Sequence, residues 1–149
     1  MSAVTSVGHL ARRFFTSLSR RPPSAADTSW ALAQLLPGES ALWQSMPVQD
    51  RRHSLLVARR FVADGPAPER AEVAGALLHD VGKREAGLGT FSRVVATIVG
   101  PRTARFRAYH DHEAIGARLA ADAGSDPVTV ELIRGRGPAA DRLRTADHV

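Results

Sequence analysis

His79 and Asp80 stand side by side at the end of an apolar segment, Ala74 to Lys83, that reads A-G-A-L-L-H-D-V-G-K. An imidazole and a carboxylate are costly to remove from water unless a partner satisfies them. A divalent cation is one such partner, because imidazole nitrogen and carboxylate oxygen suit first-row metals and Zn²⁺. The other interpretation is a helix end whose His and Asp side chains only hydrogen-bond neighbouring backbone groups. The pair alone leaves both open.

Lys83 is the only lysine of the chain, in which every other basic residue except histidine is arginine. An ammonium is a compact point charge and a guanidinium is a planar fork, so the two are not interchangeable. The position of Lys83 directly after H-D-V-G therefore indicates a specific role, with chance placement as the alternative. His53 lies on an apolar helix face, where a single histidine is more often a satisfied core residue than a ligand.

Apolar residues recur at helical spacing along most of the chain, and alternation typical of strands is never sustained. The pattern predicts an all-α fold, a helical bundle of about seven or eight helices, several of them short. The expected helices are residues 3–18, 27–36, 47–63, 68–80, 90–99, 110–123, 126–133 and 140–149, and residues 42–46 are expected as a further short helix or turn.

Local signals predict how several of these helices begin and end. Asp27 is expected to cap its helix and Pro37 with Gly38 to stop it, while Gly82 is expected to stop the helix that carries His79. Asp111 is expected as the N-cap of the helix that follows it. In residues 47–63, Leu56, Val57 and Phe61 are expected to face the core.

The length of 149 residues indicates one domain, which we place at residues 27–149, preceded by an amphipathic helix and Pro-rich linker in residues 1–26. The chain has no cysteine, so any metal must be held by His, Asp or Glu. No apolar run approaches the ~20 residues of a membrane span, and we expect a cytoplasmic location. The net charge of +5 suits an anionic small molecule, whereas scattered basic residues and few aromatic residues argue against a nucleic-acid partner.

His53, the pair His79-Asp80 and Asp147 together form an H…HD…D pattern that resembles the HD-domain superfamily of metal-dependent phosphohydrolases. L-L-H-D-V-G-K is close to the strongest local form of that signature, and the segment from His112 to Gly116-Ala117 matches an H-x-x-x-G-A opener seen in many members. The resemblance covers residues 47–149. The N-terminal region is similar to that of actinobacterial-type HD domain proteins.

The resemblance implies that His53, His79, Asp80 and Asp147 converge on one divalent metal, with Mn, Mg, Co, Fe, Ni and Zn all compatible. In members with two metals, further histidines stand in a later loop, where this chain has Arg136 and Gly137. Arginine cannot bind a cation, so a mononuclear site is expected. His112 is then either a substrate contact or proton-transfer group, or a histidine without a role.

The activity that the resemblance implies is hydrolysis of a phosphomonoester or nucleotide by metal-activated water. Asp80, Lys83 and His112 are the expected catalytic residues, and Lys83, Arg84 and Arg136 the expected contacts to a phosphorylated substrate. The alternative is a catalytically weak or inactive metal-stabilised module that senses a ligand or binds a protein. A homodimer through the N-terminal helix is a further expectation.

Overall fold

The structure is a computed structural model that describes residues 21–83 and 101–148, with the side chains of residues 101–111 left out of the description. These parts of the chain form seven α-helices and one 3-10 helix and contain no strand, which confirms the predicted all-α fold. The helices are α2 (Ala25–Ala33), α3 (Pro37–Ser45), α4 (Val48–Ala63), α5 (Arg70–Leu78), η1 (Val81–Lys83), α7 (Pro101–Asp122), α8 (Pro127–Ile133) and α9 (Ala140–His148).

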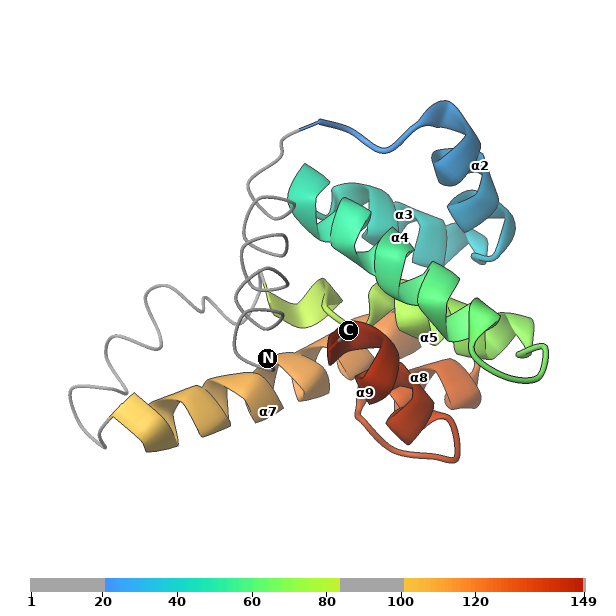
Figure 1. Ribbon diagram of the computed structural model, residues 1–149. Coiled ribbons are helices and arrows are strands. Elements are labelled where there is room, and N and C mark those ends of the chain that lie inside the picture. The colour runs from blue at the N-terminus through green and yellow to red at the C-terminus, as the bar shows by residue number, and fades with distance from the viewer. Residues whose placement is uncertain (1–20, 84–100, 149) are drawn as a thin grey trace, which may run out of the picture.

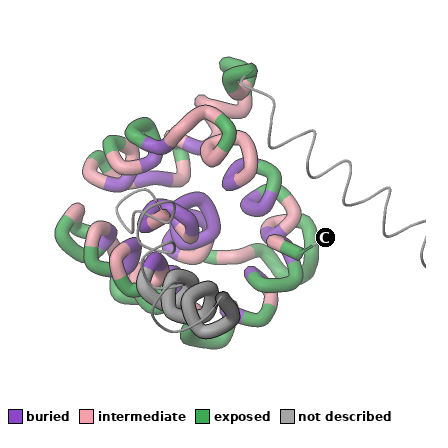
Figure 2. Tube along the Cα trace, turned by 90° about the vertical axis from the view of Figure 1, so that its left-hand side faces the viewer, coloured by how far each residue is buried: buried purple, intermediate pink, exposed green. Residues whose placement is uncertain are grey.

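Helix α5 is the centre of the bundle. It packs against α3 and α4 on one side and against α8 on another, while η1, which follows it, packs against α7 (Figure 1). Seven of its nine residues are buried, including the run from Val73 to Leu78. Figure 2 shows these buried residues gathered inside a shell of helices whose outer faces are exposed. A helix that is apolar on all sides is stable only when other helices surround it.

Small residues on α5 and η1 allow neighbouring helices to come close. A Cβ atom added to Gly75 would lie 2.8 Å from the side chain of Leu132 on α8. A Cβ added to Gly82 would lie 2.0 Å from the carbonyl oxygen of His112 and 2.6 Å from the amide nitrogen of Gly116, both on α7. The backbone of η1 therefore rests directly on the backbone of α7.

A fully buried carboxylate, Glu39 on α3, joins three parts of the bundle. Its Oε2 accepts hydrogen bonds from the backbone N–H of Leu36 at 2.7 Å and from Arg70 on α5 at 3.1 Å. Its Oε1 accepts a hydrogen bond from the hydroxyl of Ser125, in the loop between α7 and α8, at 2.8 Å. A buried carboxylate needs such partners because its charge has been removed from water.

Several predicted helix ends and faces are wrong. Ser24, not Asp27, caps α2, because the Ser24 hydroxyl accepts the Asp27 N–H. Pro37 begins α3 instead of stopping α2, as proline fits a first helical turn. Asp111 lies inside α7, which begins at Pro101. Leu56 is 43 % exposed, because the buried face of α4 runs through Leu55, Val57, Ala58 and Phe61 instead.

Gly82 does not stop α5, which ends at Leu78 with His79 as its C-cap. It lies inside η1, and its φ angle is not among the positive ones found at Gly65, Gly124, Gly135 and Gly137. Gly124, with a positive φ, follows the end of α7, and the Asp126 side chain caps α8 by accepting the Val128 N–H. The helices predicted for residues 3–18 and 90–99 lie outside the described residues, and so does the homodimer contact predicted through the N-terminal helix.

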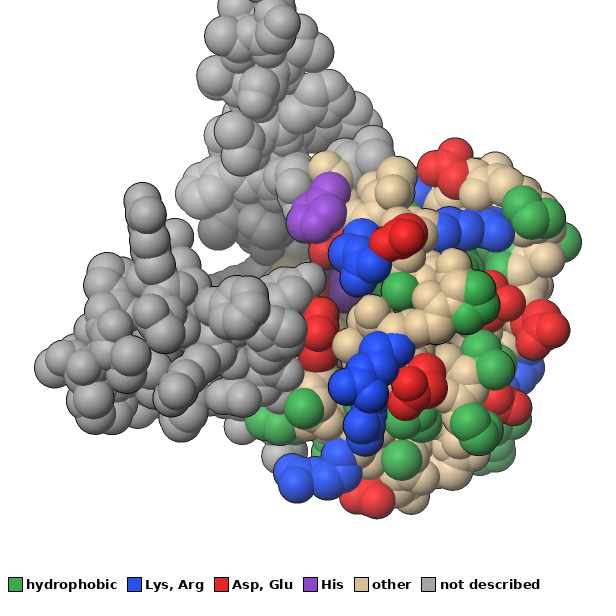
Figure 3. Space-filling view, turned by 90° about the horizontal axis from the view of Figure 1, so that it is seen from below, with side chains coloured by type: hydrophobic (Ala, Val, Ile, Leu, Met, Phe, Trp, Pro, Cys, Tyr) green, Lys and Arg blue, Asp and Glu red, His purple; other side chains and the backbone are tan. Residues whose placement is uncertain are grey.

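The described helices include none that is both long and apolar enough to cross a membrane. On the face drawn in Figure 3, basic side chains (blue) lie among acidic ones (red), so charges of both signs are mixed there.

Candidate metal centre

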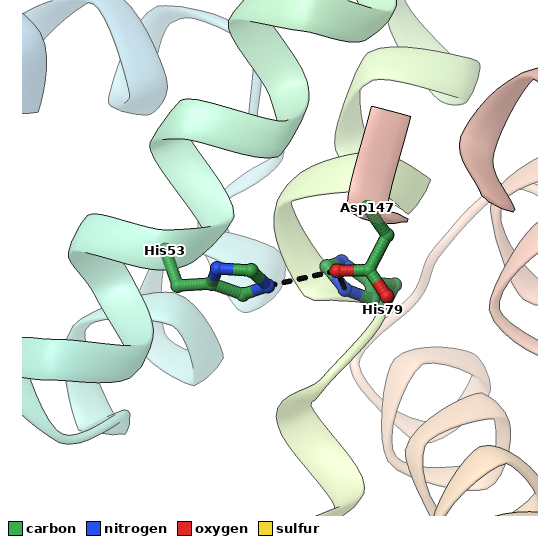
Figure 4. A group of neighbouring side chains, drawn as sticks. All are labelled: His53, His79 and Asp147. Atoms are coloured by element: carbon green, nitrogen blue, oxygen red, sulfur yellow. Dashed lines mark hydrogen bonds and ion pairs between the residues drawn. The ribbon is translucent and has the colours of Figure 1, made fainter. Parts of the chain in front are cut away.

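Three helices bring His53, His79 and Asp147 together (Figure 4). His53 lies on α4, His79 caps the end of α5, and Asp147 lies near the end of α9. The His53 Nε2 and Asp147 Oδ1 atoms are 2.8 Å apart, and the His79 Nε2 atom is 3.5 Å from the same Oδ1. One ligand atom of each residue lies within 4.8 Å of the other two. The packing of α4 against both α5 and α9 thus brings the three side chains together.

A backbone hydrogen bond orients His79. Its Nδ1 lies 2.7 Å from the carbonyl oxygen of Ala76, one turn earlier, so Nδ1 carries the hydrogen and donates it. The other ring nitrogen, Nε2, is buried and has no hydrogen-bond partner within the part of the chain that the structure describes. A histidine that binds a metal typically donates its other N–H to a carbonyl or carboxylate in this way. The arrangement turns the lone pair of a neutral His79 toward Asp147 and Asp80.

Asp80 lies beside this group and is also paired with Lys83. Its Oδ2 is 3.4 Å from the Nε2 of His79 and 3.9 Å from the Nε2 of His53. The same oxygen accepts a hydrogen bond of 2.8 Å from the Lys83 ammonium. His112, buried on α7, places its Nε2 3.9 Å from the Asp80 Oδ1. Asp80 therefore connects the three-residue group to Lys83 and His112.

The donor set fits a divalent cation. Two imidazole nitrogens and one carboxylate oxygen are ordinary ligands of Zn²⁺ and other first-row ions. In a tetrahedral site with bonds of about 2.1 Å, neighbouring ligand atoms are separated by about 3.4 Å. The 3.5 Å from His79 to Asp147 and the 3.4 Å from His79 to Asp80 agree with that spacing. His53, His79 and Asp147 would hold the ion, with Asp80 within reach as a fourth ligand.

Electrostatic coupling in this group changes the pKa values of its members. Burial alone would raise the pKa of Asp147, but the hydrogen bond to His53, the nearby Nε2 of His79 and the charges of both rings lower it well below the ordinary value. Burial also opposes ionisation of Asp80, yet His79 and Lys83 hold its pKa below the ordinary value. Burial would lower the pKa of His79, and the carboxylates of Asp80 and Asp147 outweigh it, so that the pKa is raised.

These shifts predict how the stability of the metal-free protein depends on pH. Because the pKa of His79 is raised, the protonated ring stabilises the fold fully at pH values below 6.5, the ordinary histidine pKa. This contribution is lost as the pH rises through the folded-state pKa. We expect the difference in Tm between the parent and His79→Gln, both in excess chelator, to shrink as the pH is raised above 6.5. A difference that stays constant over this range would contradict the predicted coupling.

The carboxylates contribute at the opposite end of the pH scale. Because the pKa values of Asp80 and Asp147 are lowered, both carboxylates stabilise the fold at pH values above 3.8, the ordinary aspartate pKa. This contribution is lost as the pH falls through their folded-state pKa values. The metal-free group therefore stabilises the fold most at pH values between the ordinary pKa of an aspartate carboxyl and that of a histidine ring.

The outcome differs for the two arginines that were expected to contact the substrate. Arg84 lies outside the described residues. Arg136 is exposed in the loop between α8 and α9, and no hydrogen bond or ion pair joins its guanidinium to the site residues within the described ranges. Gly137 has a positive φ of 91°, so it serves the turn that leads to α9.

Asp50 lies beside the candidate site but is not among the residues predicted for it. It lies one turn before His53 on α4, and it lines a cavity of about 300 Å³ whose wall also includes Asp80. Burial raises the pKa of Asp50, which the nearby Lys83 partly opposes. The available signal was its spacing of three residues from His53, which places both side chains on one side of a helix.

The sequence and the fold were also compared with known proteins. No protein-family model matches the chain, and neither the curated proteins nor the solved structures include a significant match.

Proposed function

We propose that this chain is a metal-dependent phosphohydrolase that acts on a phosphomonoester at a mononuclear site formed by His53, His79, Asp80 and Asp147. The observation that carries the proposal is the orientation of His79. Its Nδ1 is held by the Ala76 carbonyl, and its buried Nε2 faces two carboxylates without a hydrogen bond in the described part of the chain. The resemblance of the H…HD…D pattern to HD-domain phosphohydrolases supplies the reaction class.

Each residue of the site has a role in this proposal. A divalent cation held by the ligands would polarise a phosphoryl oxygen and lower the pKa of a water molecule, which gives a nucleophile near neutral pH. Asp80 orients that water, since its carboxylate reaches both the histidine ligands and Lys83. The Lys83 ammonium neutralises charge that develops on the phosphoryl oxygens. His112, close to Asp80, is the candidate proton-transfer group.

A metal-stabilised module without turnover is the second candidate, and the ion pair between Lys83 and Asp80 favours it. In such a module Lys83 would only balance the charge of Asp80. The two candidates make different predictions for the same variant, because removal of the ammonium affects turnover only if a phosphoryl group is transferred.

The test measures metal content and turnover in the full-length protein loaded with Mn²⁺. We expect about one equivalent of metal per chain and hydrolysis of at least one member of a phosphomonoester panel. Lys83→Gln should lower kcat about 100-fold, the usual effect of losing one group that stabilises transition-state charge, while metal content stays at one equivalent.

Asp147→Asn and Arg136→Gln serve as controls. Asp147→Asn should no longer bind Mn²⁺ at concentrations that saturate the parent, because an amide is a much weaker ligand than a carboxylate. Arg136→Gln should behave as the parent, because this exposed side chain forms no hydrogen bond or ion pair with the site residues in the described ranges. Metal binding without hydrolysis of any phosphoester would leave the non-catalytic module as the function. Absence of bound metal would overturn both.

A further inference from the structure

The cavity beside the metal centre has a composition that suits one kind of ligand. Its wall is formed by Leu42, Ser45, Met46, Pro47, Asp50, Asp80, Val81 and Leu119. Five of these eight residues are apolar, and they come from α3, the start of α4, η1 and α7. A cavity of about 300 Å³ is at the lower end of the range for small-molecule sites. It accommodates a compact group rather than a large one.

Asp80 joins this cavity to the candidate metal centre. Its carboxylate lines the cavity and also lies 3.4 Å from the Nε2 of His79. A phosphoryl group bound at the centre would therefore have the cavity next to it. The part of a phosphomonoester that extends from the phosphoryl group is its leaving group, and the cavity is where that group would lie.

The charges around the cavity do not balance. Asp80 is paired with Lys83 at 2.8 Å, so one carboxylate has its own cation. Asp50 is half-buried at the same wall, and its side chain forms no hydrogen bond or ion pair with any residue in the described ranges. Beside the paired Asp80 and the Ser45 hydroxyl, the wall thus has one carboxylate, Asp50, to which none of the described side chains donates a hydrogen bond. Specific sites usually combine an apolar wall with a few placed polar groups of this kind.

We propose that this cavity binds the leaving group of the substrate, and that Asp50 selects leaving groups with a short alkyl body and a terminal ammonium. The alkyl part would contact Leu42, Met46 and Leu119, and the ammonium would donate to the Asp50 carboxylate. The inference rests on the proposed function and adds a substrate class to it, namely the aminoalkyl phosphomonoesters.

A structural role for Asp50 is the competing explanation. It lies in the first turn of α4, where an acidic residue interacts favourably with the helix dipole. That role predicts a small loss of stability on substitution and no effect on ligand choice. A binding measurement therefore separates the two roles.

The test uses non-hydrolysable probes, so that binding is measured apart from turnover. Isothermal titration calorimetry on the full-length protein loaded with Mn²⁺ would compare ω-aminoalkylphosphonates of two, three and four carbons with n-alkylphosphonates that have the same number of heavy atoms. At the chain length that reaches Asp50, we expect the amine to bind about 10- to 100-fold more tightly, as for a charge-assisted hydrogen bond.

Asp50→Asn should bring that ratio close to one, and Asp50→Ser should do the same if the asparagine variant folds poorly. The matched control is Asp64→Asn, at the exposed C-terminal end of the same helix, which should keep the ratio of the parent. Thermal unfolding of each variant checks that the fold is retained.

The outcomes separate this inference from the proposed function. Equal binding of both probe series, or a preference that survives in Asp50→Asn, would overturn the role of Asp50 while phosphoryl binding stands. Binding of inorganic phosphate without binding of either series would exclude the cavity as the leaving-group site. If neither inorganic phosphate nor any phosphonate binds the metal-loaded protein, the proposed function fails and this inference with it.

Discussion

Gly82→Ala should destabilise the protein by about 3 kcal/mol or more and weaken metal binding at the same time. The added Cβ would lie 2.0 Å from the His112 carbonyl oxygen and 2.6 Å from the Gly116 nitrogen. Both atoms belong to the backbone of α7, so no side-chain rotation can relieve the overlap. The only response is to move η1 away from α7. Since η1 follows Asp80 directly and includes Lys83, this movement would shift both residues.

The measurement combines urea unfolding of the metal-free protein with titration of Mn²⁺. Gly116→Ala is the matched variant, because it lies on the other side of the same contact. Its Cβ would meet the Gly82 nitrogen and the Ile133 side chain at 3.2 Å, a tight but adjustable distance. Alanine also gains up to about 1 kcal/mol over glycine in a helix interior, so the net change should be within about 1 kcal/mol.

A Gly82→Ala protein as stable as Gly116→Ala would show that η1 does not rest on α7 as closely as described. A Gly82→Ala protein that is destabilised but binds Mn²⁺ with the affinity of the parent would show that η1 does not position the ligands. The two readouts therefore test the packing and its effect on the site separately.

The regular part of the fold could be predicted from local signals in the sequence. The periodic apolar residues of α4 and the proline that precedes it set its limits near residues 47 and 63. Asp126 and Pro127 mark the start of α8, and Gly124 follows the end of α7 with a φ of 89°. These features depend on a few neighbouring residues, which is why the sequence alone suffices for them.

Features set by tertiary contacts could not be predicted in the same way. Leu55 and Leu56 are adjacent apolar residues, and only the packing of other helices against α4 decides that Leu55 is buried and Leu56 exposed. Gly38 resembles a helix stop but lies inside α3. A Cβ there would lie 2.2 Å from the Ala123 carbonyl oxygen, so glycine is needed for α3 to pack closely against the end of α7. No local pattern contains that information.

In the candidate site, too, the residues could be predicted from the sequence, whereas their geometry depends on tertiary structure. His53, His79 and Asp147 could be predicted from a family pattern, and the structure places them within ligand distance of one another. That Asp80 is held by Lys83 follows from the tight turn of η1, which was expected to be a simple helix end. The side-chain geometry that fixes His79 through the Ala76 carbonyl depends on the helix continuing to Leu78.

Glu39→Ala should lower the free energy of unfolding by about 2–3 kcal/mol, because a buried carboxylate that accepts three hydrogen bonds is lost, while its partner Arg70, 37 % exposed, stays in contact with solvent. The substitution leaves the Arg70 guanidinium without its carboxylate and the Leu36 N–H without its acceptor. It also removes the acceptor of the Ser125 hydroxyl, and with it the link between α3 and the loop before α8. Urea unfolding monitored by circular dichroism measures the change.

Two further substitutions divide this effect into its parts. Ser125→Ala removes a single hydrogen bond to the same carboxylate and should lower the free energy of unfolding by only about 1 kcal/mol. Asp141→Asn removes one partner of the ion pair with Arg144 on α9, where Asp141 is 91 % exposed, and should leave stability nearly unchanged. If Glu39→Ala were no more harmful than Asp141→Asn, Glu39 could not be the buried junction of α3, α5 and the α7–α8 loop. A large loss would show that this carboxylate, which lies outside the candidate metal centre, stabilises the junction of α3, α5 and the α7–α8 loop.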